Sequence, residues 1–261
     1  MTLIIALACK NGIVMASDGQ ATAFSSGGPV RQKYQKIYKI KNLLFGASGT
    51  IGTIQRCREC VEKYADKLSE SLDQSIREET INGRVETISV RDKVRQLVYS
   101  INKRELERYK AFHDDDKGAP LADILIVLCS GEEGKLKIWH VAPDGGEEFL
   151  DELGYACTGI GDTFAYAYLA NFYSEELDVE RGKLVAYRVI KDAINIGAYG
   201  LGEPIDIWTV KVTKEDGNIK TNIRQLSQDE IFALNDAYLL WKESERKVFD
   251  SLRIPAIQSP K

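Results

Sequence analysis

The chain has 261 residues, of which 44% are hydrophobic and 28% charged, the composition of a soluble globular protein that can bury a sizeable core. Its formal net charge of -4 argues against nucleic acid as the main partner, because phosphate binding needs a basic face. The longest apolar run, residues 3–9, is too short to cross a bilayer and follows no basic segment, so we expect a mature N-terminus, a cytoplasmic protein and no membrane partner.

The first half of the chain predicts two strand pairs and two helices. Apolar runs at 3–9 and 13–17 flank Asn11-Gly12, which is a strong hairpin signal. A second strand pair is expected at 36–40 and 42–48. Apolar residues then recur at helical spacing over 50–76 and 90–112, on either side of an exposed polar link at 77–88.

The second half repeats this alternation after a loop at 113–120. Several strands in both halves of the chain are apolar on both faces, which implies burial on both sides. Strand blocks that alternate with helix pairs predict two packed sheets with helices on their outer faces, and no linker divides them. The expected strands are 122–130, 135–142, 155–159, 205–213 and 217–222, and the expected helices are 162–174, 178–197 and 228–252, before a loose tail.

Familiar catalytic and ligand-binding patterns are weakly represented. The chain has only two histidines, His113 and His140, which gives little support to a Ser-His or Cys-His site. The segment "GASGTIG" at 46–52 opens a helix but lacks the lysine of a phosphate-binding loop. Cys57 and Cys60 form a C-x-x-C pair without the further ligands of a zinc site. We therefore expect reduced core thiols, no metal and no cofactor.

The N-terminal hairpin offers a different chemistry. A threonine at a free N-terminus carries its own base, because the α-amine has an unperturbed pKa of about 7.7–8.0 and a nearby ammonium lowers it further. Such a site needs removal of Met1, a close lysine and a carboxylate that holds this lysine. The hairpin returns Asp18 towards Thr2, and a lysine on the adjoining strand can lie between them.

The first 22 residues, "MTLIIALACKNGIVMASDGQAT", resemble the start of mature proteasome β-type subunits. Further segments follow in the order of that family, and the resemblance covers roughly residues 2–215. They are "KIYKI", "CTGIGDTFAYAYL", "LDVERG" and "IDIWTV". The resemblance implies an α+β fold, a four-layer αββα sandwich of the N-terminal-nucleophile hydrolase type. We expect this domain over residues 1–226, followed by a C-terminal helical extension and tail over 227–261.

The resemblance also implies roles for individual residues. Thr2 corresponds to the nucleophile, Asp18 to the residue that orients the lysine, and Lys36, rather than Lys33, to the lysine that lowers the amine pKa. Gly46 corresponds to the oxyanion donor. An extended peptide would pair with the backbone of Thr22 and Gly46, and Leu44 and Ser48 would line the pocket beside the scissile bond.

Three positions depart from the family pattern. Ile160 stands where the family has the serine of a "GSG" segment, and Ala198 and Leu201 stand where aspartate and serine are usual. These polar groups support the threonine amine and its water in the family, so their replacement leaves the level of activity open.

The resemblance implies a threonine endopeptidase that acts on a peptide or unfolded protein and works in a homo-oligomer. Any ATPase partner is left unspecified. A transpeptidase, a small-molecule amidase and a non-catalytic scaffold subunit are alternatives, and the scaffold would retain Met1.

Overall fold

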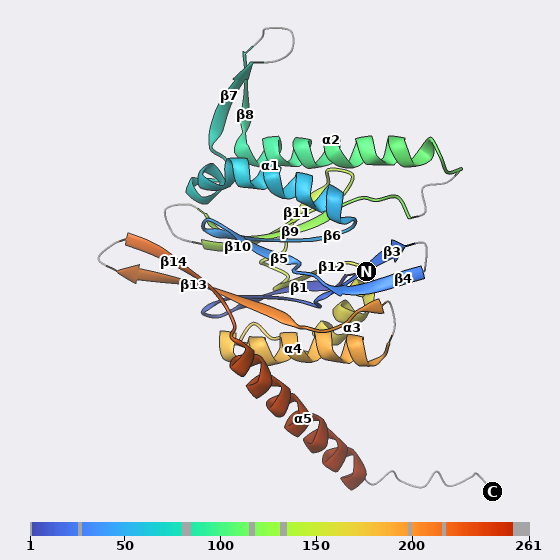
Figure 1. The fold of residues 1–261 in the computed structure, drawn as a ribbon. Coiled ribbons are helices and arrows are strands. Elements are labelled where there is room, and N and C mark those ends of the chain that lie inside the picture. The colour runs from blue at the N-terminus through green and yellow to red at the C-terminus, as the bar shows by residue number, and fades with distance from the viewer. Residues whose placement is uncertain are drawn as a thin grey trace, which may run out of the picture.

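The computed structural model describes residues 2–25, 28–79, 85–114, 118–130, 135–197, 200–215 and 218–252. Strand and helix blocks alternate along these segments (Figure 1). The first half contains β1 (Ile4–Cys9), β2 (Gly12–Ser17), β3 (Gln20–Ser25), β4 (Gly28–Lys33), β5 (Ile37–Ile40), β6 (Leu43–Ser48), α1 (Ile51–Glu70), β7 (Ser75–Glu79), β8 (Val85–Ser89) and α2 (Val90–Lys110). The second half contains β9 (Asp123–Ser130), β10 (Lys135–Val141), β11 (Glu147–Phe149), β12 (Tyr155–Thr158), α3 (Asp162–Phe172), α4 (Val179–Asn195), β13 (Asp206–Glu215), β14 (Asn218–Gln225) and α5 (Gln228–Ser251).

Two sheets lie face to face between two pairs of helices (Figure 1). One sheet has the strand order β12-β1-β2-β13-β14 and packs against α3 and α4. The other has the order β11-β10-β9-β6-β5 and packs against α1 and α2. This arrangement confirms the predicted αββα sandwich and its α+β class.

Side-chain alternation along the central strands fills three apolar layers. In β1, Ile5 and Leu7 pack towards the helices, whereas Ile4 and Ala6 pack towards the opposite sheet. Successive residues of a strand face opposite sides of its sheet, so one unbroken apolar run supplies two cores. The two-sided burial predicted for this run is therefore confirmed.

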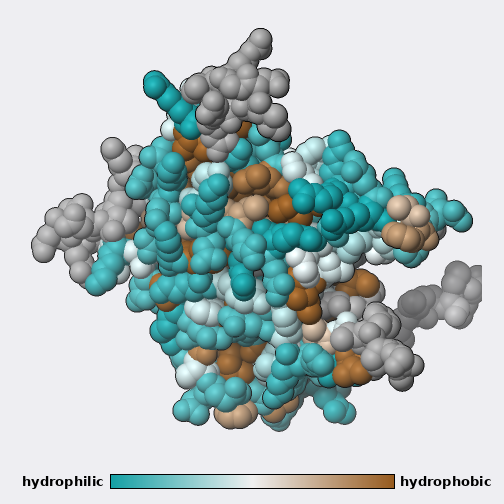
Figure 2. All heavy atoms as spheres, turned by 45° about the horizontal axis from the view of Figure 1, so that its top comes forward, coloured by the Kyte–Doolittle hydropathy of each residue, from teal (hydrophilic) through white to brown (hydrophobic). Residues whose placement is uncertain are grey.

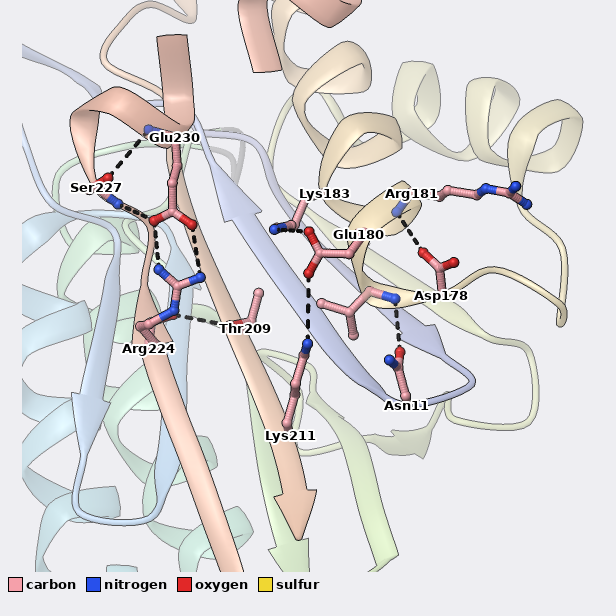
Figure 3. A network of polar contacts seen from close by, with 11 residues as sticks. Asn11, Asp178, Glu180, Arg181, Lys183, Thr209, Lys211, Arg224, Ser227 and Glu230 are labelled. Atoms are coloured by element: carbon pink, nitrogen blue, oxygen red, sulfur yellow. Dashed lines mark hydrogen bonds and ion pairs between the residues drawn. The ribbon is translucent and has the colours of Figure 1, made fainter. Parts of the chain in front are cut away.

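The first hairpin forms as predicted, but its turn lies one residue earlier. β1 pairs with β2 from Ile4 opposite Ser17 to Cys9 opposite Gly12, so the turn residues are Lys10 and Asn11. The side chain of Asn11 accepts a hydrogen bond from the backbone N–H of Val179 at 2.9 Å (Figure 3). The turn therefore also anchors the start of α4.

The prediction for residues 70–90 is wrong. α1 ends at Glu70, and the stretch expected to be the end of a helix and a polar link forms the hairpin of β7 and β8. Ile76 is 7% exposed and packs into the core beneath α1 and α2, which anchors the base of the hairpin. Because Ile76 continues the helical spacing of α1, its sequence position alone suggested a helix.

Three further strands, β3, β4 and β11, also lie where no strand is predicted. β3 and β4 pair Gln20 with Lys33 through to Ser25 with Gly28. Their sequence is rich in polar residues, glycine and proline, which are poor strand formers. This hairpin leads the chain away from Asp18 and returns it just before Lys36.

Polar contacts fix the starts of α4 and α5 (Figure 3). Asp178 caps α4 by accepting a hydrogen bond from the N–H of Arg181 at 2.8 Å. Ser227 and Glu230 form a capping box at the start of α5. Arg224 on β14 donates two hydrogen bonds to the Glu230 carboxylate, at 2.6 and 2.9 Å. The edge of the sheet thereby holds the first turn of α5.

Arg188 holds α5 against α4. Its guanidinium donates to both carboxylate oxygens of Glu245 at 2.6 and 2.7 Å and lies 4.1 Å from the centre of the Trp241 ring. Such a bidentate, stacked arrangement suits the planar guanidinium and fixes the helix orientation. Beyond this contact α5 runs away from the sandwich (Figure 1).

The surface is mixed in character, with a hydrophilic outer face on α2 (Figure 2). This face carries the exposed side chains of Lys103, Arg104, Glu107 and Arg108. None of the helices in the described segments is long and apolar enough to span a membrane.

Replacement of Asn102 by alanine should lower the free energy of unfolding by about 3 kcal/mol, because it leaves two buried backbone groups without partners. Asn102 on α2 is 1% exposed, and its amide accepts from the N–H of Ala122 at 2.7 Å and donates to its carbonyl at 2.9 Å. Urea unfolding at one protein concentration measures the change. Ser100→Ala on the exposed face of the same helix is the control and should change stability by under about 0.5 kcal/mol. Equal stability of the two variants would contradict the assignment.

Candidate active site

Thr2, Asp18 and Lys36 meet at one end of the two sheets. Thr2 lies just before β1, Asp18 directly follows β2, and Lys36 directly precedes β5 of the facing sheet. Their exposed fractions are 7%, 0% and 4%. The hairpin accounts for the approach of Thr2 and Asp18, whereas only the stacking of the sheets brings Lys36 to them.

The Asp18 carboxylate is the hub of this group. Its Oδ1 accepts hydrogen bonds from Lys36 Nζ at 2.6 Å and from the backbone N–H of Leu3 at 2.9 Å. Its Oδ2 accepts from the backbone N–H groups of Gln20 and Gly202, both at 3.3 Å. A buried carboxylate needs such partners to offset the loss of water. Asp18 therefore ties the lysine directly to the residue that follows Thr2.

Lys36, rather than Lys33, reaches Asp18. Lys33 ends β4 and is exposed, whereas the side chain of Lys36 is 3% exposed. Burial lowers the pKa of Lys36, and the charge and hydrogen bond of Asp18 oppose this shift without cancelling it. An ammonium with little access to water exerts a strong field on a neighbouring amine, because solvent screens it less.

The segment Gly159–Gly161 packs against the backbone of Thr2 and Leu3. Gly159 has φ +104°, and a Cβ at this position would lie 2.1 Å from the carbonyl oxygen of Thr2. Ile160 is 50% exposed, and Leu201 is 7% exposed and lies near Gly161. Ala198, the third position that departs from the family pattern, lies outside the described residues. The backbone that carries Ile160 thus contacts the Thr2–Leu3 segment, and Leu201 lies beside Gly161.

The residues predicted to bind substrate lie in different settings. Gly46 occupies an interior strand, and a Cβ there would be 2.5 Å from Met15 Cε. Leu44 is fully buried in the layer between the sheets, whereas Ser48 at the end of β6 is half-buried. Thr22 lies on β3 and is also half-buried. Ser48, but not Leu44, therefore presents surface in the isolated chain.

One edge of β6 is open beside Lys36. β5 begins at Ile37, which lies opposite Gly46, so among the described strands Ala47 and Ser48 have no partner on the β5 side. An unpaired strand edge can accept an extended peptide through its backbone groups. The end of β6 beyond Gly46 is therefore the strand edge at which we expect such a peptide to add.

A chain of hydrogen bonds at the same end links four strands. Ser48 Oγ lies 2.9 Å from Thr158 Oγ1, which donates to Asp123 Oδ2 at 2.5 Å. Asp123 Oδ1 lies 2.6 Å from His140 Nε2. Except for Ser48, these residues were not predicted as site residues, because they come from separate strands and form no local motif.

The two thiols of the C-x-x-C pair lie on one helix of the sandwich. Cys57 is buried and Cys60 half-buried on α1, and both are free thiols. Burial raises the pKa of Cys57 to about 12, which keeps the thiol protonated and inert near neutrality. In the part of the chain that the structure describes, no three His, Cys, Asp or Glu side chains gather as candidate metal ligands.

Comparison with known families and structures identifies the family of this fold. The model of the proteasome subunit family matches residues 2–106 and 108–210. This chain belongs to the proteasome subunit family. The match begins at Thr2 and covers both sheets and their helices as far as β13, in agreement with the resemblance over residues 2–215.

Two archaeal relatives illustrate the distance within the family. The proteasome subunit beta of Archaeoglobus fulgidus is 26% identical over 217 residues, 82% of this chain and 86% of that protein. The proteasome subunit beta of Methanothermobacter thermautotrophicus is 28% identical over 233 residues, 88% of this chain and 92% of that protein. These proteins share the family, while the identity is too low to transfer activity by itself.

Solved structures show the same fold over the whole chain. Anbu, described as an ancestral beta-subunit, from Yersinia bercovieri superposes with a TM-score of 0.65 and 12% identity, over 98% of this chain and 100% of that chain. An Anbu (Gly-1) mutant from Hyphomicrobium sp. strain MC1 gives a TM-score of 0.64 and 13% identity, with the same coverage. The fold is therefore shared although few residues are identical.

Asp18→Asn should lower the free energy of unfolding by about 3–5 kcal/mol, because it leaves the Lys36 ammonium buried without its counter-charge. Adding Lys36→Met to this variant should recover part of the loss, since the unpaired charge is then gone. Chemical unfolding measures both. The control is Asp66→Asn, which breaks the exposed pair with Lys41 and should cost under about 0.5 kcal/mol. A similar small change in both single variants would refute the coupling.

Proposed function

We propose that this chain is a threonine peptidase that forms an acyl-enzyme through Thr2 after Met1 is removed. The observation that carries the proposal is the Asp18 carboxylate, which holds the Lys36 ammonium and the N–H of Leu3 on the same oxygen. This places a buried cation close to the residue whose free amine would act as base. Met1 itself lies outside the described residues.

The proposed reaction needs no histidine, because the α-amine of Thr2 accepts and returns the proton. The Thr2 hydroxyl adds to the peptide carbonyl carbon while its proton passes to the α-amine, and the oxyanion accepts a hydrogen bond from the N–H of Gly46. When the C–N bond breaks, the leaving amine takes that proton from the α-ammonium. Water then adds to the ester with the α-amine again as base, which releases the acid and restores Thr2.

In this proposal Lys36 tunes the base and Asp18 positions Lys36. The positive charge of Lys36 disfavours a second positive charge nearby, so it keeps the α-amine of Thr2 available for proton transfer near neutral pH. Asp18 itself is held by three backbone N–H groups, which limits the freedom of the lysine.

The substrate in this proposal is an extended peptide or unfolded protein. It would add as a strand between the open edge of β6 and the segment around Thr22, with Gly46 beside the scissile carbonyl and Leu44 and Ser48 near the adjacent side chain. We further propose that the chain works in the cytoplasm as a homo-oligomer, with an ATPase partner left unspecified.

One observation favours a second candidate, a non-catalytic scaffold subunit. Ile160, which belongs to the segment that contacts the Thr2 backbone, and Leu201, which lies beside Gly161, carry no hydrogen-bonding side chain for an amine or water. A subunit of this kind would keep Met1, because a blocked amine cannot act as a base. Slow attack by water would instead favour transfer of the acyl group to another amine, as in a transpeptidase.

Intact mass spectrometry with a peptide β-lactone separates these functions. The purified chain should lack the mass of Met1 and gain one acyl group, because only a free N-terminal threonine combines hydroxyl and base. Thr2→Ala should gain none, and its peptidase rate should fall by at least ~10³-fold, whereas Thr2→Ser should still be labelled. Retention of Met1 in cells together with no adduct would rule out the enzyme and leave the scaffold subunit.

The choice between the two lysines has its own test. Lys36→Met should slow acylation by the β-lactone by roughly 10²–10⁴-fold, because the α-amine then loses the charge that tunes it. Lys33→Met is the matched control three residues away and should leave the rate unchanged, since Lys33 is exposed on β4. Thermal unfolding of both variants shows whether the fold survives. A slow Lys33→Met variant with a normal Lys36→Met variant would reverse the assignment.

A further inference from the structure

The hydrogen-bonded chain Ser48–Thr158–Asp123–His140 has no role in the proposed acyl transfer. It crosses β6, β12, β9 and β10 and joins residues up to 110 positions apart in the sequence. Thr158 is fully buried, and the side chains of Asp123 and His140 are 27% and 20% exposed. Polar side chains on four strands with this degree of burial require mutual partners, because each has lost much of its water.

Strand alternation directs these four hydrogen-bonded side chains into the space between the sheets. Gly46 and Ser48 are two residues apart on β6, on the same face as Leu44, which packs in the inter-sheet core. Thr158 lies opposite Ile4, and Ile4 is two residues from Thr2. Asp123 lies opposite Ser48 on the neighbouring strand. These four hydrogen-bonded side chains therefore close the end of the inter-sheet space where Thr2 lies.

The close approach of Gly159 to Thr2 supports the same placement. Gly159 follows Thr158 directly, and a Cβ on it would lie 2.1 Å from the carbonyl oxygen of Thr2. The backbone that carries Thr158 is thus in contact with the backbone of the candidate nucleophile. Since Ser48 Oγ lies 2.9 Å from Thr158 Oγ1, Ser48 is a close neighbour of the site.

The direction of each hydrogen bond follows from the carboxylate. A carboxylate only accepts hydrogen bonds, so Asp123 accepts one from Thr158 on one oxygen and one from His140 on the other. The single hydroxyl hydrogen of Thr158 is then committed to Asp123. Ser48 must therefore donate its own hydrogen to Thr158, because one of the two hydroxyls has to donate.

The protonation of His140 does not reverse this order. Burial acts to lower the pKa of His140, but the hydrogen bond and charge of Asp123, with the charges of Glu148 and Asp144, outweigh burial and raise it. Protonated, His140 donates from Nε2, and the neutral ring can still donate from Nε2 as the matching tautomer. In both states Asp123 remains an acceptor of two hydrogen bonds.

We propose that this row of hydrogen bonds makes Ser48 a hydrogen-bond acceptor towards the substrate. The site then favours peptides whose side chain on the acyl side of the scissile bond ends in a donor, such as lysine. This inference rests on the proposed function for the position of the substrate. With its hydrogen committed to Thr158, Ser48 presents only lone pairs on its open side. A side chain that ends in an acceptor meets lone pairs there, and an apolar side chain leaves the acceptor unpaired.

Three matched peptides test this selectivity. They are identical except for lysine, norleucine or glutamate at the position before the scissile bond, and their equilibrium binding to the full-length Thr2→Ala chain is measured by fluorescence polarisation. The lysine peptide should bind about tenfold more tightly than the norleucine peptide, and the glutamate peptide should bind most weakly. Equal affinities, or tightest binding of the glutamate peptide, would overturn the proposal.

Two variants in the same background test the hydrogen-bond order. Ser48→Ala removes the acceptor, and Thr158→Val frees the Ser48 hydrogen to turn towards the substrate, so each should reduce the preference for lysine over norleucine to about twofold or less. Thr158→Val should also improve binding of the glutamate peptide relative to norleucine. Thr209→Val is the matched control, because Thr209 is a buried strand threonine that takes no part in this row of hydrogen bonds. This variant should keep the tenfold preference.

The outcomes separate this inference from the proposed function. Binding selectivity in the Thr2→Ala chain does not require catalysis, whereas β-lactone labelling of the unmodified chain does. Selective binding without labelling would support the acceptor role of Ser48 and reject the peptidase. Labelling without selective binding would support the peptidase and reject the acceptor role of Ser48. Persistence of the full preference in both Ser48→Ala and Thr158→Val, with melting temperatures close to that of the control, would refute the role of the hydrogen-bonded chain.

Discussion

The arrangement of the candidate site depends on one buried ion pair. The side chains of Asp18 and Lys36 are 0% and 3% exposed, and removing two such charges from water costs several kcal/mol per ion. The pair persists because Asp18 also accepts hydrogen bonds from three backbone N–H groups, those of Leu3, Gln20 and Gly202. These groups belong to the start of β1, the start of β3 and the loop before β13. The same carboxylate therefore joins the N-terminus, the facing sheet and a distant loop, and it fixes where Thr2 lies.

The space between the sheets changes character along its length. Its middle is apolar and contains Met15, Leu44 and Leu125. The end near Thr2 holds Ser48, Asp123, Thr158 and His140, together with Ser17, whose buried hydroxyl has no hydrogen-bond partner among the described residues. The apolar part stabilises the sandwich, whereas the polar end costs desolvation free energy. This division matches the general pattern in which functional sites depart from the best packing.

In the peptidase proposal, the departures near Thr2 concern the fate of the acyl-enzyme more than its formation. By the family resemblance, Ile160 and Leu201 stand where polar side chains are usual, while Asp18 and Lys36 fall in the expected order. Attack by the threonine needs the amine and its nearby cation, whereas release needs an oriented water. In the peptidase proposal, apolar neighbours would therefore slow the second step more than the first and lengthen the life of the ester. Anbu structures share this fold at 12–13% identity, so they inform the architecture and not this balance.

The sequence by itself determined the sandwich, the first hairpin and the return of Asp18 towards the Thr2 end of β1, because unbroken apolar runs and a short turn act over neighbouring residues. It also indicated Lys36 over Lys33 through the family resemblance. It did not reveal the hairpins β3–β4 and β7–β8, whose polar residues carry little alternation, and it extended α1 through Ile76. Only the tertiary structure decided that Lys36 reaches Asp18 and that Ser48, Thr158, Asp123 and His140 form one chain. These contacts depend on the stacking and register of separate strands, and no local pattern encodes which side chains of two sheets will face one another.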